Sequence, residues 1–193
     1  MIAKFSVEAL GRSAAAINPG KLDWLNAQYI KKIELDELAQ RVRPFMEAKG
    51  YSITDLHLLR KVVLSLRERV KTLVEMAELA AFYFCSEIAY DEKAAEKFLS
   101  AEAIPILEEI IDRLSKETMT DKGTIHRLIQ QLAEMRAEPL VKIAQPVRVA
   151  LTGKAVSPPI DEVIEILGKE EVIRRLERAI EYIKKSGVRI SKS

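Results

Sequence analysis

The sequence predicts an all-α protein, and three observations support this fold class. Gly and Pro are few, with seven of each in 193 residues. Ala, Leu, Ile, Glu, Lys and Arg, all of which favour helices, dominate the composition. Apolar residues recur at helical spacing, and no segment shows the sustained two-residue alternation of a strand. We therefore expect packed helices and no sheet.

Capping residues and helix breakers set the expected helix boundaries. The clearest start is Ser157-Pro158-Pro159, where Ser is expected as N-cap, Pro in the first turn and acidic residues just inside. Gly168 is expected to end that helix, and the tail from residue 187 is expected to fray. The expected helices span residues 7–11, 22–33, 35–48, 52–64, 65–81, 92–99, 101–116, 121–136, 139–151, 157–168 and 170–185.

The chain is long enough for two small helical units. Tyr83-Phe84-Cys85 breaks the apolar pattern of the preceding helix, so residues 87–91 are expected to connect two subdomains. We place these subdomains at residues 21–90 and 91–193. Trp24 and Tyr29 lie in an apolar stripe, and we expect both to belong to the core.

The overall composition and net charge exclude few classes of binding partner. Thirty-one basic and 29 acidic residues leave a net charge of +2, but a nucleic-acid-binding protein needs only a local basic face. The single Cys85 cannot form an internal disulfide. No apolar run approaches the roughly 18 residues of a membrane span, and the N-terminal segment is unlike a signal peptide. The expected location is the cytoplasm, with no membrane partner.

Candidate catalytic and metal-binding patterns are missing from the sequence. His57 and His126 fall in separate expected helices, where structural or surface roles are expected. One Cys cannot supply a Cys/His metal site of the usual spacing, and no Gly-rich phosphate loop is present. We therefore expect no catalytic residue and no metal site in this chain.

Local basic charge is the remaining signal. Residues 140–159 contain three basic residues and no acid, while residues 60–71 contain five basic residues and one acid. Three of these five recur at helical spacing and are expected on one helix face. On composition alone, an ordinary solvated surface is the favoured explanation of either cluster. The basic residues are Arg60, Lys61, Arg67, Arg69, Lys71, Lys142, Arg148 and Lys154.

Three stretches resemble bacterial glutamyl-tRNA synthetases, a family of class I aminoacyl-tRNA synthetases. Residues 21–30 read Lys-Leu-Asp-Trp-Leu-Asn-Ala-Gln-Tyr-Ile, similar to the segment where these enzymes leave their catalytic half. Residues 67–75 resemble the family's Arg-x-Arg-x-x-Thr-Leu run. Residues 144–176, with Pro-Val-Arg-Val-Ala-Leu-Thr-Gly, Ser-Pro and Ile-Leu-Gly-Lys-Glu, look like its closing signature. The resemblance covers residues 5–183.

The resemblance implies two consecutive helical-bundle subdomains that form a cage around the anticodon loop of the glutamate tRNA. Residues 1–20 would then be the remnant of the segment linking to a catalytic half. That half, with its sites for ATP and glutamate, would lie before Met1, so no cofactor is expected in this chain. We expect the chain to be inactive alone, to bind no DNA and to be a monomer.

Individual roles follow from the resemblance, motif by motif. Arg148 is expected to contact an anticodon base, and Arg69 to read the third anticodon base. Arg suits both tasks because its planar guanidinium can bond a base edge and stack on it. Ser157, Pro158 and Ile160 are expected to form a nearby base pocket at a helix start. Contacts to the RNA backbone are expected from Arg60, Lys61, Arg67 and Lys71.

Some residues depart from the family pattern. Ala27 replaces the usual Gly, Pro159 follows Ser-Pro where Gly is common, and the stretch near Thr120 lacks the expected Trp. Two other interpretations stay open on the residues alone. One is a generic helical protein-interaction module with basic faces. The other is a small all-α enzyme, which the lack of a His/Cys/carboxylate cluster disfavours.

Overall fold

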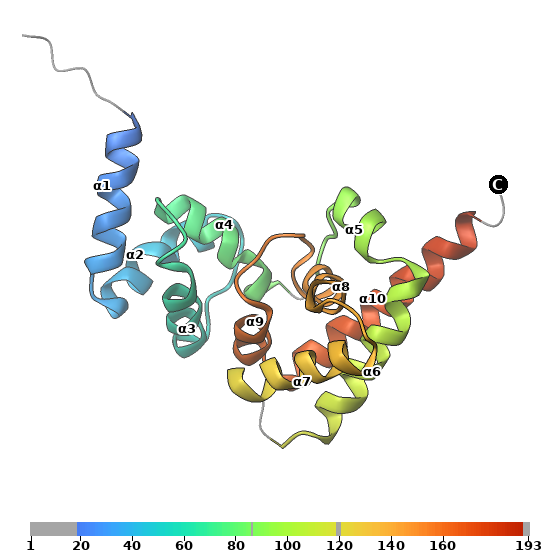
Figure 1. Ribbon diagram of the computed structural model, residues 1–193. Coiled ribbons are helices and arrows are strands. Elements are labelled where there is room, and N and C mark those ends of the chain that lie inside the picture. Colours follow the sequence, from blue (N-terminus) through green and yellow to red (C-terminus); the bar gives the residue numbers. More distant parts are fainter. Residues whose placement is uncertain (1–18, 86, 119–120, 191–193) are drawn as a thin grey trace, which may run out of the picture.

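The computed structural model describes residues 19–85, 87–118 and 121–190. These residues form helices joined by short connections, with no strand among them, which confirms the all-α prediction (Figure 1). The helix expected at residues 7–11 lies outside the described part. The helices are α1 (Pro19–Lys32), α2 (Leu35–Glu47), α3 (Leu56–Leu66), α4 (Leu73–Phe84), α5 (Glu92–Phe98), the 3₁₀ turn η3 (Ala101–Ala103), α6 (Ile104–Lys116), α7 (Lys122–Met135), α8 (Leu140–Thr152), α9 (Ile160–Leu167) and α10 (Lys169–Ile190).

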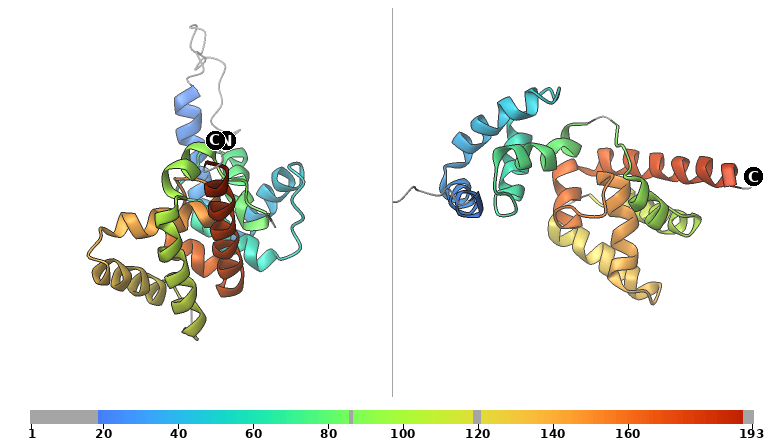
Figure 2. Two further views of the ribbon diagram at one scale, coloured as in Figure 1. Left: turned by 90° about the vertical axis from the view of Figure 1, so that its right-hand side faces the viewer. Right: turned by 90° about the horizontal axis from the view of Figure 1, so that it is seen from above.

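The helices gather into two groups that lie side by side (Figures 1 and 2). In the first group, α2, α3 and α4 pack on one another and α1 lies at the outer edge. In the second group, the long α10 packs along α6 and α8, while α7 packs on α8 and α9. The groups meet where α3 contacts α9 and α4 contacts α8. Buried apolar side chains from both groups form the core.

Helix α1 contributes little to this core. Trp24 and Tyr29 are 61% and 64% exposed, so the prediction that they are core residues is wrong. Ile30 is the buried residue of α1. The apolar stripe correctly indicated a helix, but an edge helix buries only the side that faces its neighbours.

The segment around residue 70 differs most from the expected helices. Helix α3 ends at Leu66 and α4 begins at Leu73, so the continuous helix predicted over residues 65–81 is wrong. Thr72 caps α4 by accepting a hydrogen bond from the Glu75 amide at 3.0 Å, and the Glu75 carboxylate accepts one from the Lys71 amide at 2.8 Å. This reciprocal pair is close to a capping box and starts a new helix.

Helix α9 also begins later than expected, at Ile160, with Pro159 as its N-cap. Ser157 is therefore not the N-cap, because the residue before a proline is disfavoured in the helical conformation and Pro159 keeps Pro158 outside the helix. Gly168 ends α9 at φ +79°, as predicted. Helix α10 continues to Ile190, which corrects the fraying expected from residue 187.

The described residues contain neither a membrane-spanning helix nor a cluster of metal ligands. No helix there combines the length and the low polarity that crossing a membrane requires. His57 and His126 are exposed on α3 and α7, as expected for surface residues. Across the same ranges, no three His, Cys, Asp or Glu side chains are placed to share a metal ion.

Candidate nucleic-acid interface

Arg148 on α8 is half-buried and holds a neighbouring loop by hydrogen bonds. Its Nη1 donates to the carbonyl oxygens of Ser157 at 3.1 Å and Pro158 at 2.7 Å, and to the Ser157 hydroxyl. The predicted contact residues Arg148, Ser157 and Pro158 are thus together in the structure. Because several bonds converge on one nitrogen, the direction of the guanidinium is fixed.

The loop after α8 takes its shape from Gly153. This glycine caps the helix at φ +75°, a left-handed conformation that favours Gly. A Cβ atom there would lie 2.2 Å from the carbonyl oxygen of Ala89, so only Gly permits this close approach. The Asp91 amide donates to the Gly153 carbonyl at 2.8 Å. The connector between the two helical groups is therefore held against the end of α8.

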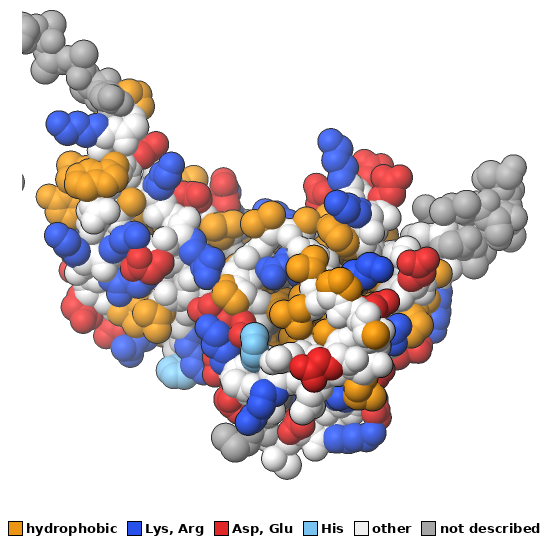
Figure 3. Space-filling view, viewed as in Figure 1, with side chains coloured by type: hydrophobic (Ala, Val, Ile, Leu, Met, Phe, Trp, Pro, Cys, Tyr) orange, Lys and Arg blue, Asp and Glu red, His pale blue; other side chains and the backbone are white. Residues whose placement is uncertain are grey.

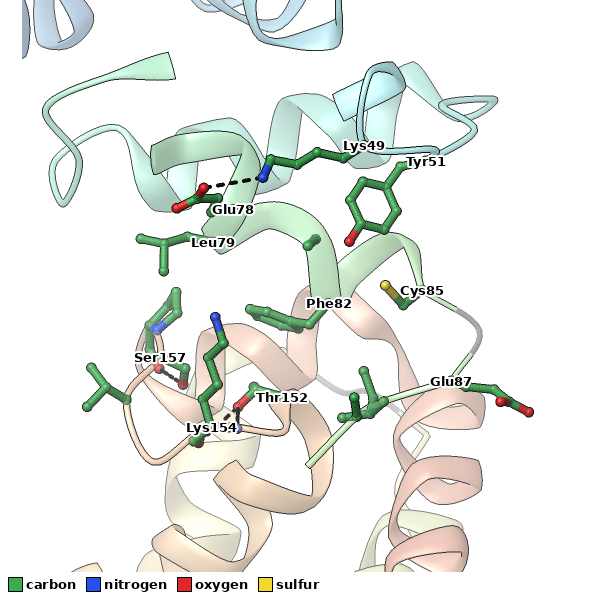
Figure 4. Close-up of a pocket in the computed structure, with 15 residues that line it drawn as sticks. Lys49, Tyr51, Glu78, Leu79, Phe82, Cys85, Glu87, Thr152, Lys154 and Ser157 are labelled. Atoms are coloured by element: carbon green, nitrogen blue, oxygen red, sulfur yellow. Dashed lines mark hydrogen bonds and ion pairs between the residues drawn. The ribbon is translucent and has the colours of Figure 1, made fainter. Parts of the chain in front are cut away.

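A cavity of about 350 Å³ opens between α4 and the loop after α8 (Figure 4). Phe82 and Leu79 line its α4 side, and Lys154 extends from the loop toward Phe82. At the rim, Lys49 pairs with Glu78 at 3.2 Å. Ser157 and Pro158 line the cavity, whereas Ile160 is buried at the start of α9 and is not part of the lining. The cavity has the mixture of aromatic wall and polar rim that small-ligand sites use.

Burial alters the acid–base properties of two tyrosines near this cavity. Burial and the neighbouring Cys85 thiol raise the pKa of Tyr51 above its ordinary value. Burial also raises the pKa of Tyr83 on α4, and this effect outweighs the neighbouring Ser65 hydroxyl and the charges of Arg69 and Arg175, which lower it. Both hydroxyls therefore stay neutral at physiological pH.

Arg69 belongs to the first helical group. It lies in the exposed turn between α3 and α4, and not on the helix predicted for it. Burial, and after it the like charge of Arg69, lower the pKa of Arg148, while Asp161 raises it. Arg148 nevertheless stays protonated at neutral pH. The charge of Arg69, from the first helical group, therefore adds to the positive field around Arg148 in the second.

Helix α3 ends at Leu66, before Arg67 and Lys71, so the prediction that Arg60, Arg67 and Lys71 share one helix face is wrong. Arg60 on α3 pairs with Asp36 at 2.7 Å. Arg67 donates from Nη2 to carbonyl oxygens at the end of α1, where it stabilises the fold. Lys61 and Lys71 are exposed, and neither side chain forms an ion pair within the described ranges. More generally, Lys and Arg side chains lie on both sides of the hollow between the groups (Figure 3).

Arg175 also organises the site, although it was not among the residues predicted from the sequence. It is only 3% exposed, and it donates to the carbonyls of Leu151 at 2.8 Å and Cys85 at 3.2 Å. Its Nε donates to Glu171 at 2.5 Å. Burial raises the pKa of Glu171, but hydrogen bonds from Arg174 and Arg175 outweigh that effect and lower it. The available signal was the position of Arg175 beside Leu176 in the buried stripe of its helix.

Known proteins similar to this chain carry one consistent description. Residues 37–180 match the family of the anticodon binding domain. Over 185 residues the chain is 43% identical to a glutamate–tRNA ligase of Geotalea uraniireducens, covering 96% of this chain and 40% of that protein. Over 184 residues it is 45% identical to glutamate–tRNA ligase 1 of Syntrophus aciditrophicus, covering 95% of this chain and 39% of that protein. The chain therefore spans about two fifths of the length of these relatives.

The fold agrees with a solved structure. The chain superposes with a TM-score of 0.81 on the crystal structure of a glutamate tRNA ligase from Elizabethkingia meningosepticum in complex with its amino acid. The match covers 93% of this chain and 35% of that one, at 24% identity, and shows a shared fold. The family match, which spans helices of both groups, confirms the family expected from the sequence: this chain belongs to the anticodon binding domain family.

Proposed function

We propose that this chain binds the anticodon loop of the glutamate tRNA, as part of a glutamate–tRNA ligase. The observation that carries the proposal is that Arg148 is bonded to Ser157 and Pro158, two residues that line a cavity with an aromatic wall. The like charge of Arg69 acts on Arg148 from the first helical group. Like charges held near each other favour an anionic ligand, and single-stranded RNA combines phosphates with bases that can leave the stack. The family and the relatives' names support a tRNA as that RNA.

The chemistry divides among the named residues. Arg148 contacts one anticodon base with the guanidinium nitrogens that the loop does not occupy. Ser157, Pro158 and the wall of Phe82 accommodate a base in the cavity, with Ile160 supporting the loop from the start of α9. Base–aromatic stacking is worth about 1–3 kcal/mol per base. Lys154 at the rim is placed to neutralise a phosphate.

Arg69 reads the third anticodon base in this proposal and favours C over G there. The Watson–Crick edge of C offers acceptors to a guanidinium, whereas that of G offers mainly donors. Lys61 and Lys71 add charge along the RNA backbone, and Arg60 joins them when RNA competes with Asp36. Arg67 is expected to contribute through the fold.

The proposal extends to the longer protein in which such a domain works. There, a catalytic part binds ATP and glutamate and joins glutamate to the tRNA, while the part described here selects the tRNA. The protein acts in the cytoplasm as a monomer. The chain alone is expected to show no glutamate-dependent ATP–pyrophosphate exchange. Exchange above background, in a preparation free of host synthetase, would contradict that division of labour.

Binding of anticodon stem-loops across a salt series tests the proposed function. The wild-type chain should prefer the C-U-C loop of the glutamate tRNA over an unrelated loop at every salt concentration. Affinity for both loops should fall as salt rises, because phosphate contacts release counterions. Arg148→Ala should weaken C-U-C binding by about 1–3 kcal/mol, the effect of losing one base contact. Equal affinity for all loops would instead favour the generic interaction module.

A further inference from the structure

The turn that carries Arg69 is fastened to the end of α1. Arg67, its first residue, donates from Nη2 to the carbonyl oxygens of Ile30 at 3.3 Å, Ile33 at 3.0 Å, and Lys31. Carbonyls in the last turn of a helix have no partner within the helix and need one from elsewhere. A cation near a helix C-terminus is also favoured by the helix dipole. Arg67 meets both requirements and fixes the start of the turn.

The other end of the turn is held by α1 as well. Asn26 Nδ2 donates to the carbonyl oxygen of Lys71. The amide of Lys71 donates to Glu75 on α4 at 2.8 Å. The peptide groups on both sides of the Lys71 Cα therefore have partners, one on α1 and one on α4. The backbone has little freedom left at this residue.

Arg69 lies between these two attachments. Its amide donates to the Leu66 carbonyl at 2.8 Å, and the next residue, Val70, is buried. On its other side, Glu68 pairs with Lys31 of α1 at 2.8 Å. No hydrogen bond or ion pair holds the Arg69 side chain within the described residues, so its guanidinium is available to a ligand while its backbone is held.

We propose that α1 is a positioning element for Arg69, with Asn26 as the positioning residue. The proposal rests on the proposed function, in which Arg69 reads the third anticodon base. An exposed Arg on a mobile turn would lose backbone and side-chain freedom on binding, and that loss weakens binding. Fixing the turn beforehand removes the backbone part of the cost. Selectivity at the third base then depends on Asn26, which is distant from Arg69 along the chain.

A double-mutant cycle tests this dependence. The quantity measured is the ratio of the Kd values for a C-U-G loop and a C-U-C loop at one salt concentration. Asn26→Ala should lower the ratio about threefold, the effect of losing a modest hydrogen bond. Arg69→Gln should lower it further. The double variant should match Arg69→Gln alone, because Asn26 acts only through Arg69.

Two further variants separate positioning from general damage. Gln28→Ala removes another amide from α1 that makes no described hydrogen bond, and it should leave the ratio unchanged. Asn26→Asp keeps the shape but cannot donate to the Lys71 carbonyl, so it should act like Asn26→Ala even if the alanine variant folds poorly. Amide hydrogen exchange at residues 67–71 should become faster in both Asn26 variants and not in Gln28→Ala.

Each alternative outcome has a separate meaning. An unchanged ratio in both Asn26 variants, with Arg69→Gln effective, overturns the positioning role and leaves the proposed function intact. If Asn26→Ala lowers the ratio by the same factor in the wild type and in the Arg69→Gln background, Asn26 acts independently of Arg69. That outcome also overturns the positioning role. An unchanged ratio in Arg69→Gln, with a selective wild type, overturns the assignment of Arg69 together with this inference. A wild type that prefers no loop overturns the proposed function itself.

Discussion

Arg148 and Arg69 occupy equivalent roles in the proposed interface, but the fold controls them in different ways. Arg148 is half-buried, and its own guanidinium is bonded to the loop at Ser157 and Pro158. Arg69 is exposed, and only the backbone around it is held, by contacts with α1. A side chain bonded to its surroundings has one direction before RNA arrives. A side chain on a fixed backbone can still select a rotamer, so it suits discrimination between similar bases.

The two sites also differ in what supports them. The Arg148 site depends on contacts between distant parts of the chain, through Gly153 and Arg175. The Arg69 turn depends on polar contacts at one edge of the first helical group. Changes beneath Arg148 should therefore reduce stability strongly, whereas changes near Arg69 should alter selectivity with little loss of stability.

The largest effect is expected from Gly153→Ala, which should lower the free energy of unfolding by about 3 kcal/mol or more. The new Cβ would combine a left-handed backbone with a 2.2 Å contact to the Ala89 carbonyl oxygen. Gly50→Ala is the matched control, since Gly50 has φ +85° and open space around it. In urea denaturation, the control should lower the free energy of unfolding by only about 1–2 kcal/mol. Equal losses would show that the contact with Ala89 is unimportant.

Arg175→Met should lower the free energy of unfolding by about 3 kcal/mol, because it leaves the carbonyls of Leu151 and Cys85 without their donor and removes one of the two arginines that bind Glu171. Lys185→Met, which breaks an exposed ion pair with Glu181, should lower the free energy of unfolding by less than about 0.5 kcal/mol. The lowered pKa of Glu171 means that its contribution is present at neutral pH and is lost as the pH falls through the folded pKa. The stability difference between wild type and Arg175→Met should therefore narrow below about pH 4.3. A difference constant with pH would contradict this account.

Arg148→Lys tests whether the geometry of Arg148 matters beyond its charge. A lysine keeps the charge but cannot bond the loop and a base at once with a planar group. Affinity for the C-U-C loop should fall by about 1–2 kcal/mol, while the salt dependence of binding should stay the same. Stem-loop titrations at four salt concentrations measure both. Full retention of affinity would mean that Arg148 serves only as a charge.

Lys61→Ala should give the smallest effect and the least specific one. Lys61 is exposed on α3 and is proposed to contact only the RNA backbone. Its loss should reduce the salt slope by about one and weaken all loops to the same extent. The same titrations with C-U-C and unrelated loops provide the measurement. A change in the preference between loops would place Lys61 among the base-reading residues.

Local sequence determined much of this protein. Helical spacing of apolar residues predicted most helices, and Gly168 marked the end of α9, because those signals act within a few residues. The closing motif indicated that Ser157 and Pro158 lie near Arg148, and they do, since the three residues are close in the chain and one loop joins them. The roles of these residues in RNA binding remain predictions.

The tertiary structure decided those features that depend on contacts between residues far apart in the sequence. Periodicity indicated that Trp24 and Tyr29 lie on a helix, but only the packing of α1 showed that they are exposed. The break before Leu73 required the Thr72–Glu75 capping pair to outweigh a continuous apolar stripe. Asn26 and Lys71 are far apart in sequence, as are Arg175 and Cys85, and no local propensity links them. Such pairs form only when packing brings a free carbonyl to a donor, and this is a property of the whole fold.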